Sequence, residues 1–546
     1  MSSNITILFS ALLVFSSPLF AQENPQVEKQ FEVPGKVDSN EQNSDEQPSG
    51  EPSPDAPATA GSDKEKEPAK AELAESEIAE TEYDTWQGSS LGVRILADAE
   101  GYYIEMVLPH VTDSPLKADD RILQVGELDL ADSLLSKLGD LLKSTAPETV
   151  LDIKIIRDSE ELVVPVTTLR HQFVDIARLV ERIKANRIIT AHLKENGRLE
   201  ELDTITDRMI EAVKSSSSPR LAYEGINQVI DEFGISHSAF VPAATYRQLR
   251  GGDGGGEMGF AIRRFSNDGK EGYFVVDSKP GTIAYESEIK LGDEILFING
   301  VKVSESRRLV LAGEEQRYKV FAIDADEDEE VKIEYRKSEN GELLTTRIPV
   351  GGPVELYDSI SKSAKVIEHN EYTFGYVRFW NLMSPRANRA LTENIESTFS
   401  ECDGLILDLR GRGGILQVVN TIERTVDRLD KPVVAITDEL TRSAKELLSY
   451  KLKKLEDVWV IGEKTSGAVT ACSFYKLPSG NVFMYPAVPG SALARHTDGN
   501  VLEGNGVEPD ENVDFYEAYC NGKDLLLDSA LDRAVKMVDE FSPNEE

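Results

Sequence analysis

The chain is poor in the residues that mark several common kinds of site. It has 59 lysines and arginines against 97 aspartates and glutamates, a formal net charge of −38. Nucleic-acid binding needs a basic face, so this balance excludes a nucleic acid as the expected partner. The three cysteines, Cys402, Cys472 and Cys520, are odd in number and widely spaced. They form no zinc-ligand pattern and no disulfide framework, so we expect free or buried thiols, and no metal or organic cofactor is implied.

The first 21 residues contain no charged side chain. A short polar segment precedes an apolar run from Ile5 to Phe20, and Ala21 supplies a small residue at a plausible cleavage point. This pattern is typical of a secretory signal peptide, although no basic residue precedes the apolar run. We expect an exported protein, periplasmic or secreted. If the segment is not cleaved, it would act as an N-terminal membrane anchor.

Residues 22–85 contain few apolar side chains and no arginine, and they are rich in Glu, Pro, Ser and Ala. Such a segment buries too little apolar surface to offset the conformational entropy lost on ordering. It is predicted to be a disordered acidic linker.

Two later segments, residues 86–170 and 256–350, repeat one order of short alternating strands. The second contains Leu291-Gly-Asp-Glu-Ile-Leu-Phe-Ile-Asn-Gly. Both segments resemble PDZ domains, which bind a peptide in a groove between a strand and a helix. The resemblance implies that two glycine-containing loops would aim backbone amides at a terminal carboxylate. The peptide-binding residues it implies are Leu91, Gly92, Val93, Met258, Gly259 and Phe260.

The segments that remain are helical or alternate between strand and helix. Residues 171–250 show apolar side chains at helical spacing and are predicted to form a helical domain. Strand-helix alternation over residues 354–520 predicts an α/β core. A C-terminal helix and tail, residues 521–546, end the chain.

Ser443 is the candidate nucleophile because it precedes an amphipathic helix. A serine oxygen there lies near the positive end of the helix, and the next amide, that of Ala444, has no partner within the helix. That amide can stabilise an oxyanion, and Gly413 and Gly414 in the loop Gly411-Arg-Gly-Gly can supply a second donor. The alternative interpretations are a plain serine N-cap and a tight strand-helix turn.

A serine nucleophile needs a base, and the chain has only six histidines. His237 follows a predicted helix in a loop, between Ser236 and Ser238. His496, in a loop near Glu503, is the competing candidate.

Four motifs then follow one another along the chain: Ile406-Leu-Asp-Leu-Arg-Gly-Arg-Gly-Gly, Ser443-Ala-Lys-Glu, Val460-Ile-Gly-Glu-Lys-Thr-Ser-Gly and Glu503-Gly-Asn-Gly-Val-Glu-Pro-Asp. In this order they resemble the catalytic domain of the carboxyl-terminal-processing protease family. The resemblance implies a multidomain protein with a crotonase-like α/β catalytic core, a helical domain, two PDZ-type β-rich domains and the disordered N-terminal linker.

One position departs from that family. Its processing branch uses a Ser-Lys dyad, and Ala468 stands where the lysine is expected. The tricorn-like branch is similar but uses a Ser-His-Ser-Glu tetrad, which this chain matches with Ser443, His237, Ser236 and Glu503. The resemblance therefore implies an exported serine endopeptidase that cleaves unfolded or tail-presented proteins captured by its PDZ domains.

Two other functions remain open at this point. The chain would be an inactive PDZ binding protein of the same fold if the loss of the lysine at Ala468 abolished catalysis. It would be a Ser-Lys peptidase if Lys445 or Lys464 served as the base.

Overall fold

The computed structural model describes residues 88–108, 111, 113–130, 134–243, 246, 256–267, 270–314, 319–513 and 518–540. The predicted signal peptide and acidic linker lie outside these residues. Within the described part, no helix is long and apolar enough to cross a lipid bilayer. All three cysteines are described, and each is a free thiol, as the sequence predicts.

The first β domain is built around one antiparallel sheet. Its strands follow the order β2 (Val93–Asp98), β3 (Gly101–Val107), β4 (Arg121–Val125), β6 (Val150–Arg157) and β7 (Glu160–Thr167). A short strand β5 (Leu128–Asp129) pairs with β4, and helix α3 (Leu135–Ser144) follows it. Strands β1 (Ser89–Ser90) and β8 (Leu169–Arg170) pair separately and close the domain.

The second β domain repeats this strand order, as the sequence pattern predicts. Its strands are β10 (Phe260–Asn267), β11 (Lys270–Ser278), β12 (Glu294–Ile298), β16 (Glu330–Arg336) and β17 (Leu344–Pro349), with β13 (Val301–Lys302) on β12 and the short helix α9 (Ile283–Glu286) after β11. Two further strands, β14 (Leu309–Glu314) and β15 (Lys319–Ile323), extend the sheet beyond β10. In the first domain the corresponding stretch of chain is helix α3.

The helical domain consists of α4 (Gln172–Ala185), α5 (Arg187–Glu195), α6 (Glu201–Ser215) and α7 (Pro219–Asp231). Local signals set its helix starts: the Asn186 side chain accepts hydrogen bonds from the amides of Ile188 and Ile189, and Ser218 caps α7 immediately before Pro219. The apolar faces of these helices form one core, which includes Ile176, Leu179, Ile205, Met209, Ile226 and Ile230.

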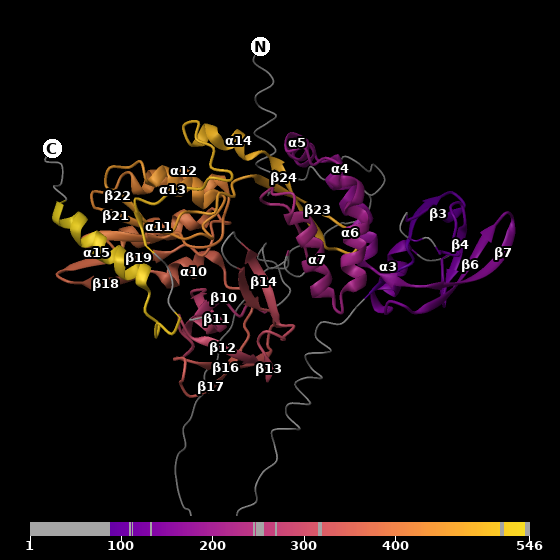
Figure 1. The fold of residues 1–546 in the computed structure, drawn as a ribbon, viewed down its shortest axis with the longest axis horizontal. Coiled ribbons are helices and arrows are strands. Elements are labelled where there is room, and N and C mark those ends of the chain that lie inside the picture. Colours follow the sequence, from indigo (N-terminus) through magenta and orange to yellow (C-terminus); the bar gives the residue numbers. More distant parts are fainter. Residues whose placement is uncertain are drawn as a thin grey trace, which may run out of the picture. The chain divides into compact units, whose positions relative to one another are not determined.

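The catalytic-type domain is an α/β sandwich with the sheet order β18 (Lys365–His369), β19 (Tyr372–Arg378), β20 (Gly404–Asp408), β21 (Val433–Thr437), β22 (Val458–Gly462) and β25 (Glu511–Asn512). From β19 to β25 the strands are parallel. Helices α10 (Leu356–Ser363), α11 (Arg386–Glu396), α12 (Leu416–Val426) and α13 (Ala444–Leu452) share a core with one face, and α15 (Leu525–Glu540) covers the other. Figure 1 shows α15 running across the strands. With both faces covered, the strands are continuously apolar.

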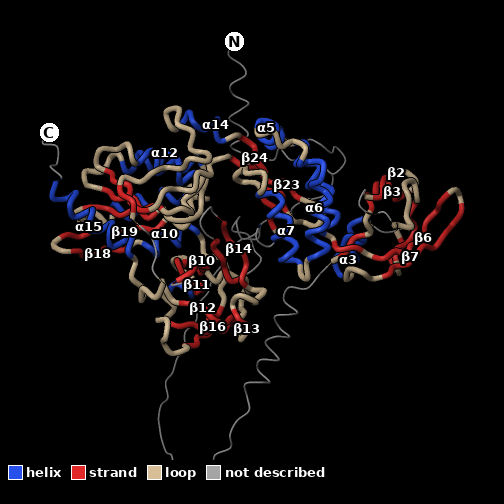
Figure 2. Tube along the Cα trace, in the orientation of Figure 1, coloured by secondary structure: helices blue, strands red, loops and turns tan. Residues whose placement is uncertain are grey.

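A third sheet joins the helical domain to the catalytic-type domain. It contains β23 (Ala471–Lys476), β24 (Val482–Val488) and β9 (Ala239–Val241), and β9 comes from the end of the helical domain. β9 pairs with β24 over residues 482–484. The side chains of Phe240 and Phe483 belong to the core of the helical domain, and Figure 2 shows β23 and β24 beside its helices. A short helix α14 (Gly490–Leu493) and a 3-10 turn at Ala494–His496 follow β24.

Candidate active site

Ser443 lies at the start of helix α13, where the sequence predicts the nucleophile. Its backbone has φ 57° and ψ −125°, a left-handed conformation that non-glycine residues rarely adopt. The turn before the helix is therefore sharp. A nucleophilic serine held on a strained turn before a helix is a recurring way of presenting its hydroxyl to a substrate.

Two groups hold the Ser443 backbone. Its N–H donates to the carbonyl oxygen of Ala468 at 2.9 Å and to Oε1 of Glu446 at 3.1 Å. The same Glu446 carboxylate accepts from the amides of Ala468, at 2.8 Å, and Gly467, at 2.6 Å, and from the Thr465 hydroxyl at 2.7 Å. Glu446 therefore fastens the Ser443 turn to the segment that contains Ala468. The spacing Ser-x-x-Glu, typical of a capping box, was the available sequence signal for this role.

Ala468 thus lies directly beside the Ser443 backbone but carries only a methyl group. The two lysines considered as alternative bases have other partners. Nζ of Lys464 forms an ion pair with Glu508 at 2.6 Å on the surface. Nζ of Lys445 is fully buried and donates to main-chain carbonyls at Phe379, Trp380, Arg410 and Gly411. Burial also lowers the pKa of Lys445 well below its ordinary value.

The glycine loop lies against Ser443. A Cβ added at Gly413 would lie 2.7 Å from Cβ and 3.5 Å from Oγ of Ser443, so only glycine fits there without displacing the serine. On the other side of the loop, the N–H of Leu382 donates to the carbonyl oxygen of Gly413, and the carbonyl oxygen of Leu382 accepts from the N–H of Ile415, each at 3.0 Å. The loop and the helix start therefore lie side by side; an oxyanion site formed by their amides stays a prediction.

A buried network of charges supports this loop. Asp408, the last residue of β20, accepts hydrogen bonds from Tyr376, Arg378 and Arg410. Arg410 also forms an ion pair with Asp524 at 2.7 Å, before α15. Every charge in this group has an opposite partner, so Coulombic attraction and hydrogen bonds offset the desolvation penalty of burying it. The network fixes the backbone from which the Gly411–Gly414 loop begins.

His237 precedes β9, so the pairing of β9 with β24 carries its loop to the catalytic-type domain. Its backbone also has a positive φ, of 57°. Its Nδ1 lies 3.1 Å from the Ser236 hydroxyl. Burial, together with the positive charge of Arg442, lowers the pKa of His237 well below its ordinary value. The imidazole is therefore neutral near pH 7 and lies within electrostatic range of the Arg442 guanidinium. Among the described residues, no hydrogen bond joins His237 to Ser443.

The predicted relay from Glu503 through Ser236 is not made in this structure. Oε2 of Glu503 accepts instead from the amides of Val469, at 2.8 Å, and Thr470, at 2.7 Å. These amides directly follow Ala468, so the carboxylate holds the same segment that Glu446 fastens. The competing histidine, His496, accepts a hydrogen bond from Nε of Arg495 at 3.2 Å, and among the described residues no hydrogen bond joins it to Ser443 or Glu503.

The predicted peptide-binding residues lie at the starts of β2 and β10. Gly92 has φ 68° and Gly259 has φ 87°, so both glycines form the expected turns. The side chains of Leu91, Met258 and Phe260 belong to the domain cores. These three residues can therefore offer a peptide only their main-chain groups.

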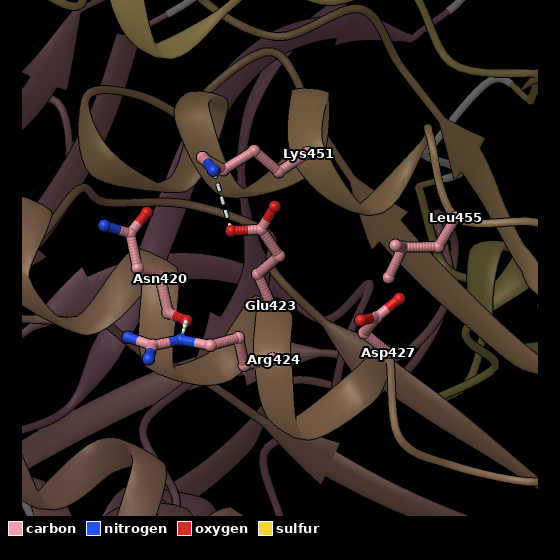
Figure 3. A pocket seen from close by; sticks show the side chains of 6 residues that line it. All are labelled: Asn420, Glu423, Arg424, Asp427, Lys451 and Leu455. Carbon is pink, nitrogen blue, oxygen red and sulfur yellow. Dashed lines mark hydrogen bonds and ion pairs between the residues drawn. The ribbon is translucent and has the colours of Figure 1, made fainter.

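A charged surface pocket lies apart from this cluster. Figure 3 shows Lys451 directed at Glu423, with which it forms an ion pair at 2.7 Å. The pocket is lined by Asn420, Glu423, Arg424, Asp427, Lys451 and Leu455. Lys451 is in the last turn of α13, whereas Ser443 precedes the first turn, so the pocket is not part of the site.

Two segments of the chain match models of known protein families. Residues 419–513, which include Ser443, Ala468 and Glu503, match the family model of Peptidase family S41. The segment that contains Ser443 is an S41-type serine peptidase domain. Residues 248–312 match the PDZ domain model, so this S41 peptidase also carries a PDZ domain. It is related to carboxyl-terminal-processing proteases and to tricorn protease.

The relatives cover different parts of this S41 peptidase. It is 24% identical over 344 residues to a carboxyl-terminal-processing protease of Picosynechococcus, covering 57% of the chain and 78% of the relative. It is 24% identical over 279 residues to the tricorn protease of Thermoplasma volcanium, covering 45% of the chain but only 25% of the relative. The solved structure of the photosystem II D1 C-terminal processing protease is similar with a TM-score of 0.36 and 16% identity, covering 63% of the chain and 92% of that structure.

We expect the Glu446 carboxylate to make the peptidase activity sensitive to pH. Burial raises the pKa of Glu446 to about 7, although hydrogen bonds from Thr465, Ala468, Gly467 and Ser443 oppose the shift. As pH falls through 7 the group gains a proton and loses acceptor capacity for these donors, so the Ser443 turn loosens. We expect kcat/KM to fall below pH 7. His237 is not the cause, because its lowered pKa keeps it neutral there.

The test is a pH profile of the Glu446→Gln variant. A glutamine does not titrate, so the inflection near pH 7 should disappear, and kcat should be lower by roughly tenfold to hundredfold because the nucleophile is less precisely held. An unchanged inflection in the variant would assign it to another group.

Lys445 and Lys464 give contrasting predictions. Lys445→Met leaves several buried carbonyl oxygens without a donor and is expected to destabilise the catalytic-type domain by about 3 kcal/mol. Lys464→Met removes one exposed ion pair and should cost less than about 1 kcal/mol. Denaturant unfolding followed by tryptophan fluorescence measures both. Loss of peptidase activity in the stable Lys464→Met variant would instead support a lysine base.

Proposed function

We propose that this S41 peptidase is an exported endopeptidase in which His237 activates Ser443. The observation that carries the proposal is the pairing of β9 with β24, because it puts the strand that follows His237 into the sheet whose strand β23 follows Ala468, and the Ala468 carbonyl accepts from the Ser443 N–H. His237 accepts the proton of the Ser443 hydroxyl as its oxygen attacks a peptide carbonyl, and then gives that proton to the leaving amine. Water releases the acyl group by the same steps in reverse.

The remaining residues support this chemistry. The amides of Ala444 and of Gly413 or Gly414 hold the negative oxygen of the tetrahedral intermediate. In this proposal the Ser236 hydroxyl oxygen accepts from Nδ1–H of His237, which leaves Nε2 free to accept a proton. Glu503 acts through Val469 and Thr470, and Glu446 through the Ser443 backbone; both are positioning residues.

The substrates proposed are unfolded or tail-presented proteins, captured by PDZ-type domains. The chain contains a domain matched as PDZ and, at residues 88–170, a domain with the same strand order, which we propose to be a second PDZ-type domain. The apolar N-terminal run supports export.

The decisive experiment combines labelling with fragment analysis. The purified chain is incubated with a fluorophosphonate probe and, separately, with unfolded casein. Labelling at Ser443 and casein fragments cut at internal bonds are the expected results. A chain that neither reacts with the probe nor cuts casein would instead be a binding protein, the function that Ala468 in the lysine position favours.

A further inference from the structure

The glycine loop beside Ser443 contains one charged residue, Arg412. It lies between Gly411 and Gly413, and Gly413 is the residue whose backbone packs against Ser443. The Arg412 side chain is partly exposed. Within the part of the chain that the structure describes, its guanidinium makes no hydrogen bond and no ion pair. The loop therefore carries a positive charge without a counter-ion, one residue away from the contact with the nucleophile.

An aromatic ring holds this guanidinium in place. Cζ of Arg412 lies 5.7 Å from the centroid of the Trp380 ring, within the range of a cation–π contact. Trp380 is buried, and its carbonyl oxygen accepts from Nζ of Lys445 at 3.3 Å. The ring is therefore a fixed support. Since a ring offers no oxygen acceptor, the N–H donors of the guanidinium remain available to a ligand.

The carboxylates that attract Arg412 are already bound to other cations. Burial lowers the pKa of Arg412 below its ordinary value, and the charges of Glu257 and Asp277 oppose this shift. Each oxygen of Glu257 accepts from Nζ of Lys279 at 2.7 Å, and Asp277 accepts from Arg378. An anion brought to Arg412 would therefore compensate a charge that the protein itself leaves unpaired.

The position of Arg412 makes the substrate the source of such an anion. Successive residues of an extended peptide are about 3.3 Å apart, so residues next to a carbonyl held at Ser443 come within reach of the guanidinium. A guanidinium binds a carboxylate through two parallel N–H···O bonds. In an internal segment of an unfolded protein, the carboxylates are those of aspartate and glutamate side chains.

We propose that Arg412 binds an acidic side chain of the substrate beside the scissile bond, so that the peptidase prefers bonds flanked by aspartate or glutamate. The proposal rests on the proposed proteolytic function, for which it names the class of substrate. Arg412 is a specificity-determining residue in this assignment, whereas Ser443 and His237 carry out the chemistry.

Binding can be measured without cleavage. The full chain carrying Ser443→Ala is titrated by calorimetry with two heptapeptides of alanine and leucine, acetylated and amidated, that differ only in a central glutamate or glutamine. We expect the glutamate peptide to bind at least about tenfold more tightly, because it alone offers a carboxylate. Adding Arg412→Gln should remove this difference. Equal affinities in the Ser443→Ala chain, or binding of neither peptide, would overturn the proposal.

Arg424→Gln is the matched control, since it removes the same charge from the same domain. Arg424 is exposed on α12 in the pocket of Figure 3, and its Nε donates to the carbonyl oxygen of Asn420 at 2.9 Å. The preference for glutamate should persist in this variant. A preference lost equally in both arginine variants would reflect net charge and would refute a site at Arg412.

A third peptide tests the other source of a carboxylate. It carries the central glutamine and a free C-terminal carboxylate. If Arg412→Gln weakens the binding of this peptide but not of the glutamate peptide, Arg412 binds chain ends, and the proposed preference for acidic side chains is wrong.

Cleavage supplies an independent readout. Fragments of unfolded, dephosphorylated casein should show aspartate or glutamate within two residues of the cut bonds more often than its composition predicts, and Arg412→Gln should abolish this enrichment. Fragments without the enrichment would contradict the role of Arg412 alone. A chain that cuts no casein would instead contradict the proposed function, and the peptide titrations would still decide whether Arg412 binds a carboxylate.

Discussion

Replacing Ser443 with alanine is expected to lower kcat/KM for unfolded casein by about 10⁴-fold or more, because the nucleophile is lost and only oxyanion stabilisation and binding remain. The variant should fold normally, since the hydrogen bonds to Ala468 and Glu446 that hold the turn are made by the backbone N–H of Ser443. Activity is measured from initial rates of casein cleavage, and labelling by a fluorophosphonate should disappear with it.

Ser449→Ala is the matched control for this change. Ser449 lies on the same helix, and its hydroxyl donates to the carbonyl of Lys445 at 2.8 Å. Its loss should leave the rate within about threefold of wild type, because no reacting atom is touched. If Ser443→Ala and Ser449→Ala chains cleave casein equally fast, Ser443 is not the nucleophile.

Replacing His237 with glutamine is expected to lower kcat/KM by about 10³-fold, because the amide cannot take the proton from Ser443. KM should change little, since the substrate is bound mainly by other groups. The Ser443 hydroxyl should also label far more slowly with a fluorophosphonate. Rates and labelling times measured at pH 8 check both effects.

His496→Gln is the comparison, because it makes the same chemical change at the competing histidine. His496 contacts Arg495 in the turn after α14, so its replacement should leave the rate near that of wild type. A slow His496→Gln chain beside a fast His237→Gln chain would transfer the role of base to His496.

The candidate nucleophile could be predicted from sequence because its signals are local. Helical spacing after residue 443 predicts a helix start, and the structure begins α13 at Ala444. The positive φ of Ser443 could not be predicted in this way, because it depends on contacts with Gly413 and Ala468 that come from other parts of the chain. Glu446 was overlooked as a positioning residue, although its spacing from Ser443 carried a signal.

The second β domain matches a PDZ domain as its motif predicts, but the chain beside β10 differs from the expectation. Its Leu-Gly-Asp-Glu motif lies at β12 as expected, and the strand order matches that of the first domain. The groove implied by the resemblance needs a helix beside β10, yet residues 309–323 contribute strands β14 and β15 there. Strand pairing depends on residues far away in the sequence. The apolar pattern of a short segment is therefore similar whether the segment forms a helix or an edge strand.

By itself, the sequence determined the local elements: the helix that begins after Ser443, the glycine loop before α12, the buried parallel strands and the repeated strand order of the two β domains. The tertiary structure alone decided that β9, directly after the His237 loop, pairs with β24, that Glu503 bonds Val469 and Thr470, and that β15 pairs with β10 in the second β domain. The physical reason is the distance along the sequence over which each interaction acts. Helix periodicity and turn residues act over a few positions, whereas β9 and β24 pair across more than two hundred residues, and that pairing is set by the packing of whole domains.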